Sequence, residues 1–256
     1  MKKVFSIAVM IFLFPFFAQA MTIVNVQQAV DVAGKQRMLT QRMLADYVMM
    51  GMNSNFKDPR TDLIRVVKEF NENLEAVSRY DQSRGVKLKI SKVQALWATA
   101  RKSLKKQPTM QNCDTLWIEM DTLLTYCNDI VVAIKKSAKN QLGEIVDLSG
   151  RQRMLSQRIA GLYILNLWAQ DRSVYQEKLD EAMSLFGHSM NRLKQYGKNT
   201  EEINALITRV ETSYHYLEKM NSLESSMQTM PSLVYQKLDD ILITMDKITH
   251  LYASAK

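Results

Sequence analysis

The sequence has few residues that break or cross-link a chain: eight glycines, four prolines and two cysteines in 256 residues. Its long uninterrupted segments repeat apolar residues with a 3.6-residue period, and almost no two-residue alternation occurs. On one continuous helix Cys113 and Cys127 would lie about 21 Å apart, too far for a disulfide. We therefore predict an all-α chain with two buried thiols and no disulfide framework. An intermolecular disulfide is the alternative in an oxidising compartment.

Residues for catalysis and metal binding are also scarce. The three histidines form no i, i+4 pair, and neither a glycine-rich phosphate loop nor a Ser/His/Asp constellation occurs. The adjacent acids Glu201-Glu202 and Asp239-Asp240 point to different sides of a helix, so we expect them to cap it or face water. Methionine thioethers near position 50 could bind Cu(I), but methionine also fills helical cores. The sequence predicts no enzyme, no metal and no cofactor.

The charge is moderately basic, with a formal net charge of +8 at pH 7. Basic residues are scattered along the predicted helices and accompany no nucleic-acid motif. Such a surface attracts small anions or anionic headgroups weakly, and no nucleic-acid partner is expected.

One twelve-residue segment occurs twice. Residues 31–42 read DVAGKQRMLTQR and residues 147–158 read DLSGRQRMLSQR, with eight identical positions and conservative changes at the others. Aromatic residues recur at the same spacing, since Phe70 and Tyr80 correspond to Phe186 and Tyr196. The duplication therefore covers the mature chain, and it predicts two modules at 21–140 and 141–256.

Each copy places an arginine within an apolar stripe. At about 100° per residue, Gly34 and its apolar neighbours share one face with Arg37 and Gln41. The second copy repeats this arrangement with Gly150, Arg153 and Gln157. A guanidinium in an apolar seam is costly unless an anion or a hydrogen-bonding group meets it. Each copy therefore predicts a partner for its arginine.

The other charged residues of the repeat wind to a different face. Lys35 and Arg42 share it with Asp31 and Asp46, and we expect this face to be solvated. The matching residues of the second copy are Asp147, Arg151 and Arg158. A third face, which carries Leu39 and Met43 in the first copy, is expected to form each module's own core.

The motif Gly-x-x-Arg-Met-x-Thr/Ser-x-Arg resembles the P-box of the NarX and NarQ nitrate sensors, and equally the N-terminal module of the PilJ family of type IV pilus chemotaxis transducers. The first copy matches at Ala33, Gly34, Arg37, Met38, Thr40 and Arg42. The second matches at Ser149, Gly150, Arg153, Met154, Ser156 and Arg158. Ser149 and Thr40 depart slightly from the usual Ala and Ser.

The resemblance implies an antiparallel four-helix bundle for each module. It also implies that Arg37 and Arg153 bind an anion, because in the nitrate sensors the equivalent arginine holds nitrate where two first helices meet. The predicted oxyanion site comprises Gly34, Arg37, Gln41, Gly150, Arg153 and Gln157. PilJ-type modules share the motif without an established nitrate role, so the resemblance leaves the ligand open.

The N-terminus has the pattern of a secretory signal peptide. A basic start at residues 1–3, an apolar run at 4–17 and Ala18-Gln19-Ala20 predict export to the periplasm with cleavage after Ala20. An uncleaved membrane anchor is the alternative, although the apolar run is shorter than the ~20 residues that a spanning helix needs.

Glycine and proline positions divide the chain into helices. In the first half we expect helices at residues 22–52, 60–82 and 88–105, and a fourth that begins at 112 or 114. In the second half we expect a first helix that ends at 169, and three more at 174–196, at 200–223 and from 232 to the C-terminus. No proline interrupts 114–168, so we favour two bundles stacked end to end through one long shared helix, each arginine then needing a second chain. The alternative is a break near 139–143 that places the modules side by side, with Arg37 facing Arg153.

Two functions remain open from the sequence. One is a periplasmic module that binds nitrate, nitrite or a similar oxyanion and reports to a separate membrane sensor or chemoreceptor. The other is a protein-interaction module of a chemotaxis, type IV pilus or two-component system with no small ligand, in which the arginines are structural. A polar face lined by other cations would favour the first. An Asp or Glu that faces the arginines in the fold would favour the second, because that carboxylate would already occupy the site.

Overall fold

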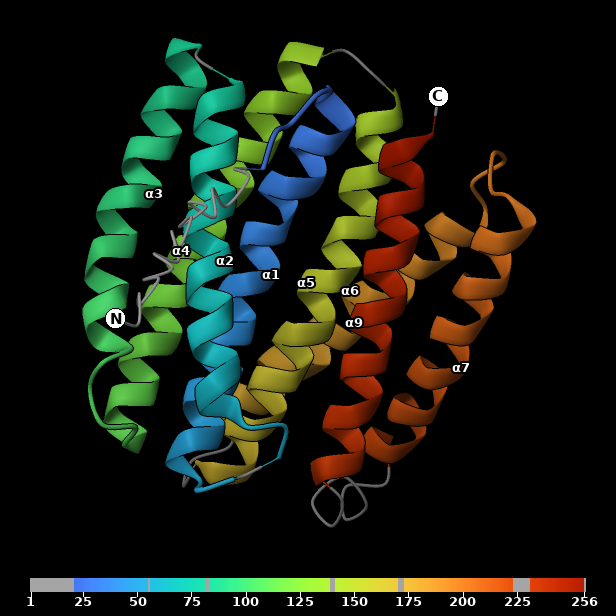
Figure 1. The fold of residues 1–256 in the computed structure, drawn as a ribbon. Coiled ribbons are helices and arrows are strands. Elements are labelled where there is room, and N and C mark those ends of the chain that lie inside the picture. Colours follow the sequence, from blue (N-terminus) through green and yellow to red (C-terminus); the bar gives the residue numbers. More distant parts are fainter. Residues whose placement is uncertain are drawn as a thin grey trace, which may run out of the picture.

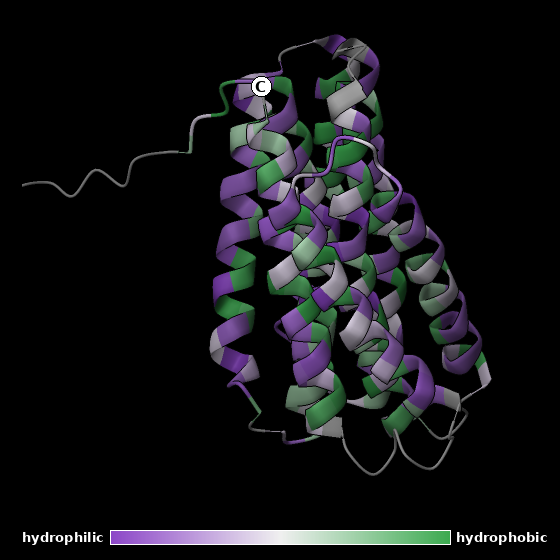
Figure 2. Cartoon of the chain, turned by 90° about the vertical axis from the view of Figure 1, so that its right-hand side faces the viewer, coloured by the Kyte–Doolittle hydropathy of each residue, from purple (hydrophilic) through white to green (hydrophobic). Residues whose placement is uncertain are grey.

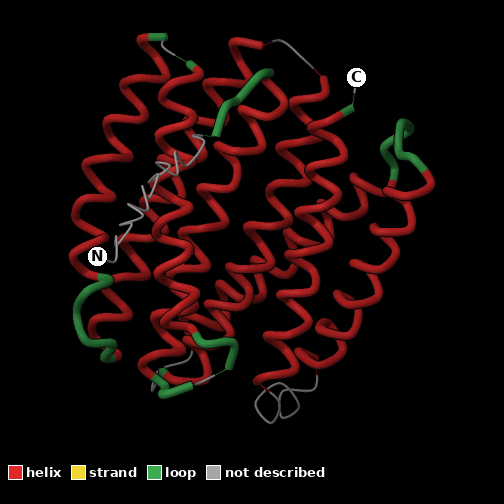
Figure 3. Tube along the Cα trace, in the orientation of Figure 1, coloured by secondary structure: helices red, strands yellow, loops and turns green. Residues whose placement is uncertain are grey.

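The structure, a computed structural model, describes residues 21–255 apart from 55, 82, 139–140, 170–172 and 223–230. This part of the chain contains helices and no strand (Figure 3). The helices are α1 (Val26–Gly51), α2 (Pro59–Tyr80), α3 (Arg84–Ser103), α4 (Met110–Ala138), α5 (Gln141–Trp168), α6 (Ser173–Lys194), α7 (Glu201–Ser222) and α9 (Pro231–Ser254). The predicted all-α class is confirmed, while the predicted signal peptide lies outside the described residues.

Side-chain caps set several helix starts. Asn25 accepts a hydrogen bond from the amide of the third residue of α1 at 2.8 Å, and Pro59 occupies the first position of α2. We expected α4 to begin at residue 112 or 114, but it begins at Met110. Thr109 provides the reason, because its hydroxyl accepts the amide N–H of Asn112 at 3.3 Å.

Each half of the chain packs as an antiparallel four-helix bundle. In the first, α1 contacts α2 and α4, and α3 packs on α4; in the second, α5 contacts α6 and α9, and α7 packs on α9. Equivalent aromatic pairs join the second and third helices: Phe70 and Trp97 have ring centroids 4.5 Å apart, and Phe186 and Tyr214 have centroids 4.7 Å apart. The predicted duplication therefore extends to the core packing.

The modules lie side by side, so the end-to-end rod is wrong. Helix α4 ends at Ala138, α5 begins at Gln141, and the two run in opposite directions (Figure 1). The most extensive helix contact in the described chain joins α1 to α5. Val30, Ala33 and Leu44 on this seam are at most 1% exposed. A rod would leave the apolar stripes of α1 and α5 in water, whereas folding back buries each against the other.

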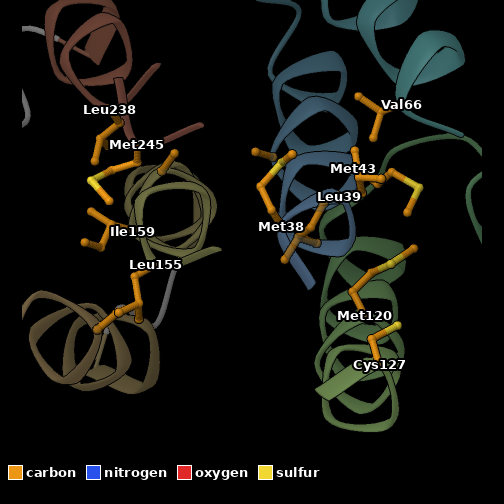
Figure 4. Packing of buried hydrophobic residues seen from close by; sticks show 14 of the residues in the cluster. Met38, Leu39, Met43, Val66, Met120, Cys127, Leu155, Ile159, Leu238 and Met245 are labelled. Atoms are coloured by element: carbon orange, nitrogen blue, oxygen red, sulfur yellow. The ribbon is translucent and has the colours of Figure 1, made fainter. Parts of the chain in front are cut away.

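Apolar side chains fill each module on either side of the seam. Figure 4 shows Leu39 and Met43 of α1 near Met120 of α4, and Ile159 of α5 near Met245 of α9. The hydropathy colouring of Figure 2 shows both apolar and hydrophilic residues on each visible helix, as expected for amphipathic helices around a core. Cys113 and Cys127 are buried free thiols, as predicted. None of the described helices is long and apolar enough to cross a membrane.

Candidate functional site: the paired P-box arginines

Arg37 and Arg153 meet on the seam between α1 and α5. Both are almost completely buried, with 1% and 0% of their surface exposed. A Cβ added to Gly34 would lie 3.3 Å from Nη2 of Arg37 and 3.7 Å from Nη2 of Arg153. One added to Gly150 would lie 3.2 Å from Nη2 of Arg153 and 3.5 Å from Nη2 of Arg37. The two glycines therefore leave the space in which both guanidinium groups fit.

Arg37 has one partner in each module. Its Nη1 donates to Oδ1 of Asn128 on α4 at 2.8 Å, and its Nη2 lies 2.8 Å from Oδ1 of Asp147 on α5. Asp147 also receives Nζ of Lys135 at 2.8 Å. The carboxylate that meets Arg37 therefore comes from the opposite module and is shared with a second cation.

Arg153 repeats the arrangement with a second carboxylate. Its Nη2 lies 2.7 Å from Oδ1 of Asp31 on α1, and its Nη1 donates to Oδ1 of Asp246 on α9 at 2.6 Å. The backbone oxygen of Asp31 also accepts from Nη2 at 3.3 Å. Asn128 and Asp246 thus occupy equivalent places, one neutral and one charged.

The pKa values of the two arginines shift in opposite directions because of this difference. Burial lowers the pKa of Arg37 and outweighs the attraction of Asp147. Burial opposes charge on Arg153 as well, but Asp31 and Asp246 raise the pKa of Arg153 above its ordinary value. Burial alone would raise the pKa of Asp147, yet Arg37 and nearby cations lower it to about 2. The Asp147 carboxylate is therefore charged at neutral pH.

The two predicted glutamines have other partners. The amide of Gln41 donates to the Thr40 hydroxyl at 3.2 Å, and Oε1 of Gln157 accepts from Nη1 of Arg42 at 3.0 Å. Within the described residues neither amide hydrogen-bonds to Arg37 or Arg153. The structure thus brings four of the six predicted residues together and places the two glutamines beside them in the seam.

The expected solvated face of α1 is largely wrong, and Arg42 shows why. Arg42 is only 6% exposed, because α9 of the second module covers the face that a single bundle would leave in water. Its Nε donates to Oδ2 of Asp62 at 2.6 Å and its Nη1 to Oδ1 of Asp239 at 2.8 Å. Its guanidinium also lies over the Tyr235 ring, 5.3 Å from the centroid. Asp239, predicted to cap or face water, is buried as well.

The arginine of the second module that corresponds to Arg42 has a simpler set of contacts. Arg158 is half-buried and pairs with Asp121 of α4. Asp121 stands 118 residues before Asp239, and Arg158 stands 116 residues after Arg42, so the two ion pairs are reciprocal contacts between modules. Arg151 is exposed as expected, and Lys35 is partly exposed. The reciprocal pairs relate the modules as a twofold axis relates the subunits of a dimer.

Asp46 is the second unexpected residue at this interface. It is fully buried, and Nε of Arg42 lies 3.7 Å from its Oδ1. Burial raises the pKa of Asp46 well above that of an ordinary aspartate, and the neighbouring Asp62 adds to the effect while Arg42 opposes it. The corresponding residue of the second module is Leu162.

One feature of the sequence indicates which carboxylates meet the arginines. Asp31 and Asp147 are identical in the two copies, six residues before Arg37 and Arg153. Six residues correspond to 240° around a helix, so each aspartate points away from the arginine of its own helix. It can meet only the arginine of the other copy. That pairing becomes visible once the two helices are known to lie side by side.

The fold and the polar seam define a class of protein. The described chain contains two fused helical modules with a symmetric polar seam, and no group of histidine, cysteine or acidic residues in it has the arrangement of a metal site. The chain is thus a duplicated helical-bundle protein whose two modules pair through their first helices, α1 and α5.

The family comparison identifies the module. The model of the PilJ family, described as the type IV pili methyl-accepting chemotaxis transducer N-terminal domain, matches residues 22–118 and again residues 137–234. The chain therefore belongs to this family and carries its module twice. The family consists of non-catalytic sensor domains, which in chemotaxis transducers are typically periplasmic. Neither the search of curated proteins nor the search of solved structures found a match.

Proposed function

We propose that this chain is an exported sensor-class module that acts through a protein partner, a membrane chemoreceptor or a type IV pilus component, with its arginine pair serving as an internal clamp. The observation that carries the proposal is the carboxylate at each buried guanidinium: Asp147 at Arg37 and Asp31 at Arg153. These carboxylates occupy the position in which a small anion would be expected. The arginines thereby hold the two modules together.

Charge balance supports the clamp. The charges of Arg37, Arg153, Asp31 and Asp147 sum to zero, the charge of Asp246 is matched by Lys35, and Lys135 also pairs with Asp147. An oxyanion entering this cluster would bring another negative charge into a buried site and would have to displace a carboxylate from a guanidinium. The wild-type site therefore favours its own side chains over a free anion.

Oxyanion binding remains the second candidate, on one specific observation. Nε of Arg37 and Nε of Arg153 are buried without a hydrogen-bond partner in the described chain. Unused donors on both arginines, beside the glycines that line the seam, are groups that nitrate or nitrite could accept from. Binding would require the carboxylates to move aside.

Thermal unfolding in millimolar nitrate, nitrite, sulfate and chloride separates the two functions. For the clamp we expect no selective change in Tm for the wild-type protein. Ligand at a hundred-fold excess over its Kd stabilises a native protein by about 2.7 kcal/mol, which would shift Tm by a few degrees. A selective shift with nitrate or nitrite that is absent in Arg37→Ala and Arg153→Ala would establish oxyanion binding and contradict the clamp.

A double variant tests whether the carboxylates keep the site closed. Asp31→Asn with Asp147→Asn keeps the side-chain shape but removes two negative charges next to the guanidiniums. We expect this variant to be less stable than wild type and to gain stability with nitrate. Asp121→Asn, which changes an aspartate of the interface outside the cluster, is the matched control and should gain none.

The partner is tested by cross-linking in the bacterial cell that makes the protein. Ile64 on α2 and Ile243 on α9 are apolar residues with 69% and 61% of their surface exposed. A photo-reactive amino acid at either position should cross-link to a chemoreceptor or pilus protein if the module signals by contact. Recovery of the un-cross-linked chain alone from both positions would oppose this function.

A further inference from the structure

We infer that an aromatic cavity between the two modules binds a small quaternary ammonium cation. The cavity measures about 600 Å³, within the range of small-molecule sites. It lies where the start of α4, the end of α5 and the start of α6 meet, at the end of the molecule opposite the C-terminus of α9 (Figure 1). Its main lining residues are Met110, Asp114, Trp117, Trp168, Val174 and Tyr175. The site is separate from the paired arginines and does not depend on their proposed role.

Three aromatic rings from three helices converge on this cavity. Trp117 and Tyr175 form an edge-to-face pair with centroids 5.4 Å apart. Trp168 packs tightly on Gly51, where an added Cβ would come within 2.3 Å of its ring. The rings are therefore held in place by the fold and do not move freely on the surface. Fixed aromatic faces around a cavity are the usual means of binding a quaternary ammonium group.

The symmetry-related place at the interface shows what such a ring does when a cation is available. Tyr235 is the counterpart of Trp117, since each stands four residues before the aspartate that pairs across the modules, Asp239 or Asp121. The Arg42 guanidinium lies over the Tyr235 ring, and Phe56 packs edge-to-face on it at 5.7 Å. No described cation lies over Trp117. Of these two symmetry-related places at the interface, one thus has an internal cation and the other has a cavity.

Asp114 supplies the charge that a cation needs. Its Oδ1 accepts the Tyr175 hydroxyl proton, and it forms no ion pair with any described residue. Hydrogen bonding to Asp114 and, more strongly, burial raise the pKa of Tyr175, so this phenol stays neutral. The cavity therefore combines three aromatic rings with one uncompensated carboxylate, which is the complement of a compact organic cation.

The number of acceptors selects the type of cation. A primary ammonium has three N–H donors that must be satisfied on burial, and the cavity offers only one carboxylate, already shared with a phenol. A trimethylammonium group has no donor and needs only aromatic and apolar contact. Met110 and Val174 supply apolar surface beside the rings.

Titration with choline chloride, followed by NMR of the three indole N–H signals, tests this inference. We expect choline to shift the signals of Trp117 and Trp168 and to leave that of Trp97 unchanged, because Trp97 donates to Asn71 within the first module. Ethanolamine and 3,3-dimethylbutan-1-ol, the uncharged carbon analogue of choline, should bind at least about tenfold more weakly. Sodium chloride at equal ionic strength is the salt control.

Variants separate the ring from the charge. Trp117→Leu should weaken choline binding about tenfold, and Asp114→Asn should weaken it severalfold while keeping an acceptor for Tyr175. Tyr216→Leu, which removes a 40%-exposed aromatic ring elsewhere, should leave binding unchanged. Equal affinity for the uncharged analogue, equal shifts of all three indoles, or an unaltered affinity in Asp114→Asn would each overturn the inference. If Trp117→Leu lowers Tm, Asp114→Asn alone decides the outcome.

Discussion

The two modules contain the same arginine motif but surround it differently. Arg42 in the first module contacts Asp62, Asp239 and Tyr235 and is only 6% exposed, whereas Arg158 in the second pairs with Asp121 at the edge of the interface. On the seam the order is reversed, because Arg153 has two carboxylates and Arg37 has one. Duplicated helices therefore fixed the geometry of the interface, and later substitutions distributed its charges unequally.

The largest decrease in the free energy of unfolding is expected when Arg42 is replaced. Arg42→Met would remove the buried cation shared by Asp62 and Asp239 and leave them only the more exposed Arg65 and Lys57, which should cost about 3–5 kcal/mol of unfolding free energy. Arg158→Met removes a more exposed pair and should cost about 1 kcal/mol or less. Urea unfolding followed by circular dichroism measures both variants. Equal losses would show that the two sites are energetically equivalent despite their different burial.

For the seam arginines, the larger loss of unfolding free energy is expected in the second module, at Arg153. Arg153→Met leaves Asp31 without its cation and Asp246 with only the longer Lys35 pair at 3.4 Å, and it should cost about 3–5 kcal/mol. Arg37→Met leaves Asp147 still paired with Lys135, so we expect a loss smaller by about 1–2 kcal/mol. The same urea experiment provides the comparison. A greater loss for Arg37→Met would mean that the second carboxylate contributes nothing.

Replacing Asp46 with leucine gives the first module the residue of the second and changes the pH dependence. A carboxyl whose folded pKa is raised binds its proton more tightly in the folded state, so its contribution is present below the unfolded pKa, near 4, and is lost as pH rises toward the folded pKa. The facing groups Arg42, Asp62 and Arg65 stay in place. The stability of Asp46→Leu relative to wild type should therefore increase from pH 4 to pH 7.

The same pH series contains an internal control. The pKa of Asp147 is lowered to about 2, so its stabilising contribution is present above pH 4 and is lost as pH falls from about 4 to about 2. Wild type and Asp46→Leu should lose this contribution alike. A difference confined to acid pH would assign the change to some group other than Asp46.

The smallest effect is expected at Gly161, whose counterpart in the first module is Ala45. An added Cβ would make only ordinary contacts, the nearest with the backbone oxygen of Gln41 and a side-chain carbon of Leu44 at 3.8 Å. Gly161→Ala should therefore raise the unfolding free energy by about 0.5–1 kcal/mol through helix propensity. Gly150→Ala, whose Cβ would lie 3.2 Å from Arg153, should not be stabilising. Thermal unfolding distinguishes the two.

Much of the fold was predictable because it depends on local pattern. The scarcity of glycine and proline predicted the helices, the repeat predicted two like modules, and the stripe around Arg37 and Arg153 predicted that both would be buried and need partners. The sequence did not predict the buried state of Arg42, because α9, distant in sequence, covers the face that carries it. The predicted start of α4 was a smaller error and a local one, because the capping role of Thr109 was missed.

By itself the sequence determined the helices, the duplication and the need for a counter-charge at each P-box arginine, since helical period and the cost of burying a guanidinium are properties of single segments. Only the tertiary structure decided that α4 and α5 fold back and that Asp31 and Asp147 neutralise the arginines of the opposite module. The physical reason is that no proline in the sequence marks the boundary between α4 and α5. The stripes of α1 and α5, 116 residues apart, are buried only when they meet each other.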